Sequence, residues 1–204
     1  MVIEGTAGQR VVSDGADAEI RMGRYGCAAV MDSHARYYDA VSRGNCYIAS
    51  MQAAAALGTA LTATAVTMTL FNPAGSGRNL VLMQTTLAVV VGTTAGFVVY
   101  GVNGTAGQAA PTVTTVLASG IQNALVGGGN TAVGVVYSAA TLPAAPVARR
   151  VLAGIISTTP GGVHTIIDNV EGGIILQPGM MVTVQGVTSN ATGVISYLWE
   201  EVLA

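Results

Sequence analysis

The sequence predicts an all-β protein, a β-sandwich preceded by an N-terminal extended arm and one short α-helix. Three observations support this fold class. After residue 44, apolar and polar residues alternate with a period of two, as they do in half-buried strands. Clusters of Gly, Pro and Asn separate these runs and leave no room for the crossover helices of a parallel α/β fold. The charged residues gather near the N-terminus, which indicates two parts, residues 1–44 and residues 45–204.

The composition separates these two parts and predicts self-association. Only 9% of the 204 residues are charged, against about 25% in ordinary soluble domains. Residues 1–43 hold eleven of the eighteen charged residues, residues 79–148 hold none, and every basic residue is an arginine. Because such a body has little charge to keep a monomer in solution, we expect a homo-oligomer, a trimer first and a dimer as the alternative.

The N-terminal part combines an extended arm with a helix. Residues 1–25 lack any burial pattern, so we expect an arm that orders against a partner. Residues 28–43 carry acid-to-arginine pairs four residues apart and end at Gly44, which predicts a helix with a glycine cap. Charges of this kind select a partner and set its register. The candidate docking residues are Arg10, Arg21, Arg24, Asp32, Arg36, Asp39 and Arg43.

The body is predicted to be a succession of strands. Alternation and turn residues place them at 45–52, 60–71, 79–91, 95–103, 113–118, 131–138, 149–157, 163–168, 173–176, 180–188 and 193–202. The turn in LFNPAGSGRNLVL, residues 70–82, lacks the lysine and hydroxyl residue of a phosphate-binding loop. We therefore expect it to close a β-hairpin between the flanking runs.

Membranes, nucleic acids and secretion are not indicated. The apolar run at 48–71 is interrupted by Ser50, Gln52, Gly58 and several threonines, unlike a spanning helix. A net charge of −2 without lysine disfavours phosphate-rich partners. The first residues lack the basic and apolar segments of a signal peptide, so synthesis in a cytoplasm is expected.

No catalytic or cofactor site is predicted. Ser33 and His34 are adjacent on the expected helix and point about 100° apart. His164 and Asp168 would lie about 13 Å apart along a strand. Glu200 and Glu201 are adjacent and therefore face opposite sides of a strand. The two His and two Cys lack metal-ligand spacing.

Two further residues carry specific expectations. Trp199 is either a platform on which a sugar stacks or, as we expect for a lone tryptophan on a terminal strand, part of the packing. Cys27 and Cys46 bracket the expected helix and would be held about 24 Å apart by it. We therefore expect two free thiols.

The C-terminal third carries a resemblance. EGGIILQPGMMVTVQGVTSNATGVISYLWEEV, residues 171–202, resembles the closing strands of jelly-roll and β-sandwich proteins from tailed-bacteriophage virions. RYYDAVSRGN at 36–45, followed by FNPAGSGRNLVL at 71–82, resembles head decoration (cement) proteins. The resemblance implies a jelly-roll-like body on the outer capsid surface, with the major capsid protein as partner. It implies a structural role without chemistry, and the alternative is a tail-fibre, adaptor or glycan-binding virion module.

Overall fold

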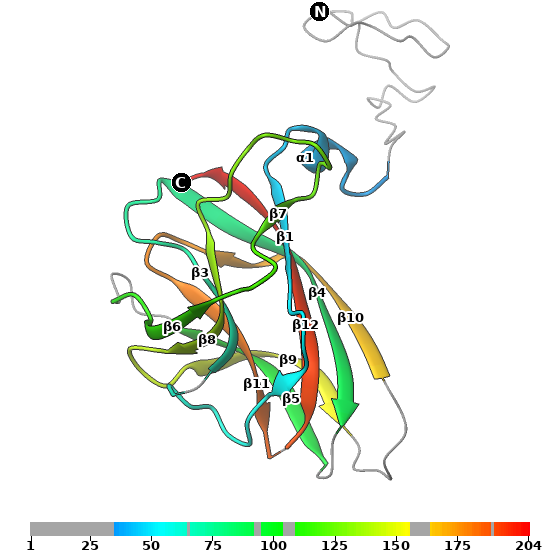
Figure 1. Cartoon of the computed structure of the whole chain (residues 1–204), viewed down its shortest axis with the longest axis vertical. Coiled ribbons are helices and arrows are strands. Elements are labelled where there is room, and N and C mark those ends of the chain that lie inside the picture. Colours follow the sequence, from blue (N-terminus) through cyan, green and yellow to red (C-terminus); the bar gives the residue numbers. More distant parts are fainter. Residues whose placement is uncertain (1–34, 65, 92–94, 104–108, 156–163, 189) are drawn as a thin grey trace, which may run out of the picture. The chain divides into compact units, whose positions relative to one another are not determined.

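The computed structural model describes residues 35–64, 66–91, 95–103, 109–155, 164–188 and 190–204. The chain divides into two units, Met1–Asp39 and Ala40–Ala204. The second unit consists of two antiparallel sheets that pack face to face as a sandwich (Figure 1). The predicted all-β fold class is therefore confirmed.

The first sheet, sheet I, has the strand order β10-β4-β12-β1-β7, and β2 pairs with β12 off this path. Its strands are β1 (Cys46–Ser50), β2 (Ala55–Ala56), β4 (Arg78–Val91), β7 (Gln122–Asn123), β10 (His164–Leu176) and β12 (Thr192–Leu203).

The second sheet, sheet II, has the strand order β6-β8-β3-β11-β5-β9. Its strands are β3 (Val66–Phe71), β5 (Gly96–Asn103), β6 (Thr112–Val116), β8 (Val135–Thr141), β9 (Val147–Ile155) and β11 (Met181–Val187).

The strand pairing defines a jelly roll. The first four long strands pair with the last four in reverse order: β1 with β12, β3 with β11, β4 with β10 and β5 with β9. Folding such a long hairpin over into two sheets gives the nested Greek keys of a jelly roll. The segment between β5 and β9 adds β6 and β8 to sheet II and β7 to sheet I. It therefore widens both sheets on the side of β1 and β3.

The core lies between the sheets and follows the alternation in the sequence. Along β12 every second side chain is buried, and Ile195, Tyr197 and Trp199 are fully inaccessible. Leu80 and Leu82 of β4 pack beside them, and Tyr100 enters from sheet II. A period of two thus directs one face of each strand inward, as the sequence predicts.

The connection after β3 differs from the predicted hairpin. Strand β3 belongs to sheet II and β4 to sheet I, so residues 72–77 cross between the sheets. The buried Asn72 side chain holds this corner. Its amide nitrogen donates to the carbonyl of Arg78 at 2.7 Å and to that of Leu176 at 2.8 Å, while its oxygen accepts from the Ser76 hydroxyl. Pairing with a distant strand, rather than turn chemistry, decides where β4 goes.

The first half of the strand expected at 60–71 is also different. Residues 59–64 form a loop, and the strand begins only at Val66. Gln185 of β11 captures this loop, because its side chain accepts from the backbone amide of Thr62 and donates to the Thr62 carbonyl. The small Ala and Thr side chains in this stretch give a strand little to bury, so a specific hydrogen-bonded loop covers the outer side of sheet II instead.

The expected short helix is present, but in the described residues it is shorter than the expected range 28–43. Only Tyr38–Ser42, α1, is helical, and Arg36 precedes it in a turn, while residues 28–34 lie outside the described residues. None of the α1 residues is buried, so no tertiary packing stabilises further turns. The expected cap is confirmed, because Gly44 has a φ of +71° and its amide bonds the Val41 carbonyl.

Candidate functional site

The candidate docking residues fall into two groups. Arg10, Arg21, Arg24 and Asp32 lie outside the described residues. Arg36, Asp39 and Arg43 are solvent-exposed. Asp39 lies in α1, whereas Arg43 follows its last residue, so these residues do not share the single helical face that the sequence predicts.

Trp199 belongs to the core. Its indole is fully inaccessible and lies beside Tyr47, with ring centroids 6.0 Å apart. A stacking platform needs an exposed ring face, so burial supports the packing interpretation and not the ligand platform.

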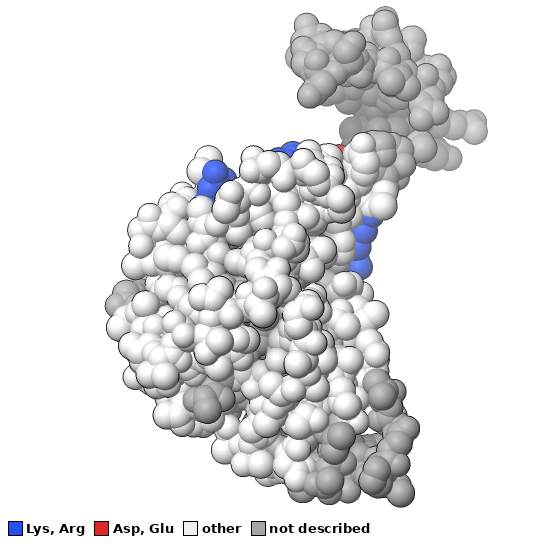
Figure 2. Space-filling model, viewed as in Figure 1, with Lys and Arg blue, Asp and Glu red and all other residues white. Residues whose placement is uncertain are grey.

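The outer face of sheet I is poor in charge and rich in aliphatic side chains. Strand alternation turns both aliphatic and polar residues away from sheet II: Ile48, Val81, Ile167, Ile175, Val194, Leu198, Ser50, Gln84, Thr86, Asn169, Ser196 and Glu200. Ile167 remains 60% exposed and Ile175 54% exposed. Figure 2 shows one side of the molecule, where few charged atoms appear on the body. Exposed aliphatic groups on adjacent strands are typical of an interaction surface.

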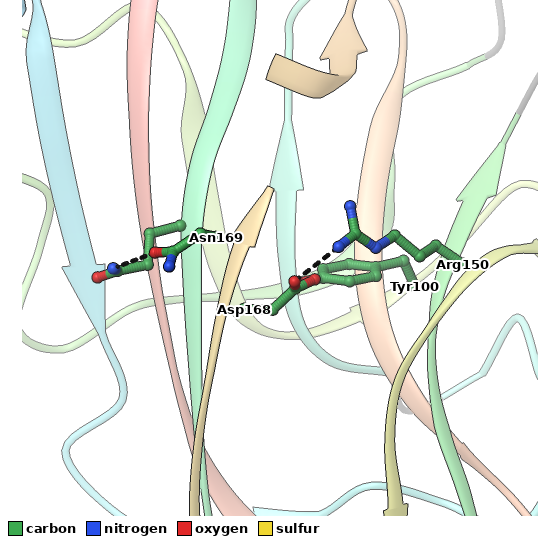
Figure 3. Close-up of polar contacts among 5 residues, drawn as sticks. Tyr100, Arg150, Asp168 and Asn169 are labelled. Atoms are coloured by element: carbon green, nitrogen blue, oxygen red, sulfur yellow. Dashed lines mark hydrogen bonds and ion pairs between the residues drawn. The ribbon is translucent and has the colours of Figure 1, made fainter. Parts of the chain in front are cut away.

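A polar cluster joins the two sheets on the side of β9 and β10 (Figure 3). Arg150 Nη2 donates to Asp168 Oδ1 at 2.7 Å, and the Tyr100 hydroxyl donates to Asp168 Oδ2 at 3.0 Å. Burial of the Tyr100 phenol raises its pKa above the ordinary value, which keeps the hydroxyl protonated as a donor. Asp168 therefore ties β10 of sheet I to β9 and β5 of sheet II, which is a structural role.

A second cluster surrounds Glu201, whose side chain is only 3% exposed. Its Oε1 accepts from the backbone amide of Gly134 at 2.9 Å and from the indole of Trp199 at 3.2 Å. The amide of Val133 contacts both carboxylate oxygens, at 3.1 and 3.0 Å. This carboxylate therefore fixes the segment that leads into β8.

The residues before and within this segment line a pocket of about 540 Å³. The pocket opens beside β7, where the segment between β5 and β9 widens both sheets. Its walls contain amides, two hydroxyls, one aromatic ring, glycines and aliphatic side chains: Tyr47, Val116, Leu117, Gly120, Ile121, Gln122, Asn123, Gly128, Gly129, Asn130, Thr131, Ala132, Gly134, Val135 and Val136. A smaller pocket of about 210 Å³ shares Tyr47, Asn130 and Thr131 with it and adds Arg78 and Glu201.

Sequence reasoning missed this pocket but contained a signal for Glu201. The expectation that Glu200 and Glu201 face opposite sides is confirmed, since Glu201 is buried and Glu200 only partly so. The same alternation puts Glu201 on the side of Tyr197 and Trp199, which marks it as a buried carboxylate. The donors that satisfy it come from residues 133 and 134, and no local pattern connects them to β12.

No family model, curated protein or solved structure matches this chain. Within the described ranges, no group of three His, Cys, Asp or Glu residues is placed to hold a metal ion. No helix in the described part of the chain is long and apolar enough to cross a membrane. Fold and site together define a jelly-roll protein with a body poor in charge and a larger pocket whose lining is polar and uncharged.

Proposed function

We propose that the protein is a structural component of a bacteriophage virion, a head decoration (cement) protein that binds the major capsid protein. The observation that carries this proposal is the separation of charge: the outer face of sheet I carries aliphatic and uncharged polar side chains with few charges, while eleven of eighteen charged residues precede residue 44. An assembly protein buries a face that is poor in charge against its neighbours, and it selects its partner through charged residues. The jelly-roll topology is compatible with this role but also occurs in other functional classes.

The mechanism is the burial of surface between neighbouring subunits. The four strands β10, β4, β12 and β1 lie about 4.8 Å apart and average about ten residues of about 3.3 Å each, so the face measures on the order of 600 Å². A stable interface buries about 800 Å² per partner. The outer face of sheet I would therefore supply most, but not all, of the area that one such interface needs in a homo-oligomer, a trimer or a dimer, on the shell.

The arm, residues 1–25, supplies docking in this proposal. Ordering an extended segment costs about 1 to 2 kcal/mol per residue. Binding to the capsid protein has to exceed that cost, which charge pairing and burial of the arm achieve together. The body then adds buried area between capsid subunits and stabilises the shell against internal pressure.

The test is the copy number on heads purified from the phage whose genome encodes the chain. We expect the full chain at a fixed ratio to the major capsid protein. Deleting residues 1–25 should leave the melting temperature of the body nearly unchanged and strongly reduce incorporation. Arg149→Gln, which removes an exposed charge outside the arm and outside the candidate docking residues, is the matched control and should be incorporated at the full level.

Two results would contradict the proposal in different ways. Truncated protein that occupies heads at the full level would show that the arm is not the anchor. A chain that is absent from heads but present in the tail fraction would replace the decoration role with the tail-fibre or adaptor alternative.

A further inference from the structure

We propose that the pocket beside β7 binds a neutral, hydroxyl-rich ligand of the size of a mono- or disaccharide. The inference is independent of the capsid role, because it rests on the walls of one pocket in the isolated chain. Ligand pockets usually measure about 300 to 1,000 Å³. The volume of about 540 Å³ lies within this range.

The chemistry of the walls selects the ligand class. None of the fifteen residues around the larger pocket is charged. An anion would require a cationic or strongly donating site, and a metal ion would require carboxylates. The polar side chains are instead three amides, Gln122, Asn123 and Asn130, and the hydroxyls of Tyr47 and Thr131. Amides and hydroxyls both donate and accept hydrogen bonds, as sugar hydroxyls do.

Several of these polar atoms are available to a ligand. Gln122 Nε2 donates to the Ser119 carbonyl, and Asn130 Nδ2 donates to the Gly44 carbonyl. Within the described part of the chain, Gln122 Oε1, Asn130 Oδ1 and Thr131 Oγ1 have no hydrogen-bond partner. A purely apolar ligand would bury these atoms unsatisfied, which costs free energy. A ligand with hydroxyl groups satisfies them.

The walls are held in place before any ligand arrives. Asn123 donates to the Gly44 carbonyl at 2.8 Å and accepts from the Leu125 amide at 2.8 Å. On the opposite wall, Glu201 fixes the amides of Val133 and Gly134. A site of fixed shape spares a ligand the cost of ordering the loop.

The smaller adjoining pocket adds one group of each charge sign to this uncharged lining. Its walls include the planar carboxylate of Glu201 and the planar guanidinium of Arg78, beside Asn45 and Asn130. Glu201 Oε2 accepts from a single amide, that of Val133, whereas Oε1 accepts from three donors. An oxygen with spare acceptor capacity beside a five-donor guanidinium suits a ligand with neighbouring hydroxyl groups.

Saturation-transfer NMR on the full chain tests the proposal with glucose, galactose, mannose, N-acetylglucosamine, lactose and maltose. We expect saturable binding of at least one of them, with a Kd of about 1 mM. Thr131→Val removes an exposed hydroxyl without changing the side-chain shape, and should weaken binding about 3- to 10-fold. Thr114→Val, on exposed β6 outside the pocket, is the matched control and should bind as the wild type does.

A blocking variant keeps the test decisive. A Cβ added at Gly129 meets nothing within 4 Å. Gly129→Leu should therefore fold normally and, because Gly129 lines the pocket, should weaken binding by narrowing it. The proposal is overturned if no sugar in the panel shows saturable transfer, if Gly129→Leu binds normally, or if inorganic phosphate competes for the site. Any of these results leaves the capsid proposal intact, because copy number on heads does not depend on the pocket.

Discussion

Removing the Glu201 carboxylate is the sharpest perturbation that the structure offers. The Glu201→Ala substitution deletes an acceptor that serves three donors, the amides of Val133 and Gly134 and the indole of Trp199. A buried donor left without an acceptor costs about 1 to 3 kcal/mol. At the lower end of this range, loss of the acceptor for all three donors lowers the free energy of unfolding by about 3 kcal/mol.

Two matched variants separate charge from shape. Glu201→Gln keeps an oxygen at the position of Oε1. Its amide nitrogen takes the position of Oε2, 3.0 Å from the Val133 amide nitrogen, so that two donors face each other. We expect a loss of about 1 to 2 kcal/mol from this one mismatch. Glu200→Gln, on the outer face of sheet I, should change the free energy of unfolding by less than about 0.5 kcal/mol.

Equilibrium unfolding in urea at a fixed protein concentration measures these differences. Trp199 is the only tryptophan in the chain and lies at the site, so its fluorescence follows the same transition. A loss of about 3 kcal/mol corresponds to a fall of about 6 to 12 °C in melting temperature for a domain of this size. If Glu201→Ala costs less than about 1 kcal/mol, the carboxylate does not hold the segment before β8, and our account of the pocket wall is wrong.

Four further predictions concern other parts of the body. Asn72→Ala should lower the free energy of unfolding by about 2 to 4 kcal/mol in urea, since two backbone carbonyls lose their donor; a loss below about 1 kcal/mol would contradict this. Burial, and then the neighbouring Glu200 carboxylate, raises the pKa of the Cys46 thiol from 9.0 to about 12. In a Cys27→Ser background, the Cys46 thiol should resist alkylation at pH 8 until the chain unfolds. The free energy of unfolding should fall as pH rises from about 9 towards 12, because the thiol ionises at a lower pH in the unfolded chain than in the folded one. Asp168→Asn should cost less than about 1 kcal/mol, because its arginine partner is 43% exposed, and a larger effect in urea would show that the cluster matters more than its exposure implies. Light scattering at micromolar concentration should find a homo-oligomer whose size does not change with salt, and a monomer would refute the expected self-association.

Period-two alternation was sufficient to predict most strands of the body. The run at 193–202 is the clearest case, because β12 extends from Thr192 to Leu203 and buries every second residue. Alternation reports which side chains a strand buries, and this property is local. The runs at 163–168 and 173–176 were both predicted as strands, and the structure joins them into β10 across a register shift between Asn169 and Ile174.

The errors arise where long-range contacts decide the outcome. The turn at 72–77 has the composition of a hairpin, yet Asn72 bonds a carbonyl on β10 and the chain crosses to the other sheet. Thr62 lies in an alternating stretch, yet Gln185, far along the chain, holds it in a loop. The pocket has the same origin, because its walls come from β1, β7, β8 and the loops between them. No window of the sequence contains these contacts.

The reverse-order pairing of the strands has a consequence for how the chain is made. Apart from a short pairing with β7, strand β1 finds its partner only when β12 exists, since Cys46 pairs with Glu200. Closing such long loops is entropically costly and makes folding slow. During synthesis the early strands leave the ribosome with apolar faces and open edges, and they remain exposed until the last strand inserts between β4 and β1. Synthesis of β12 is thus the event that commits the chain to its fold, and loss of residues 195–204 would leave sheet I without its central strand.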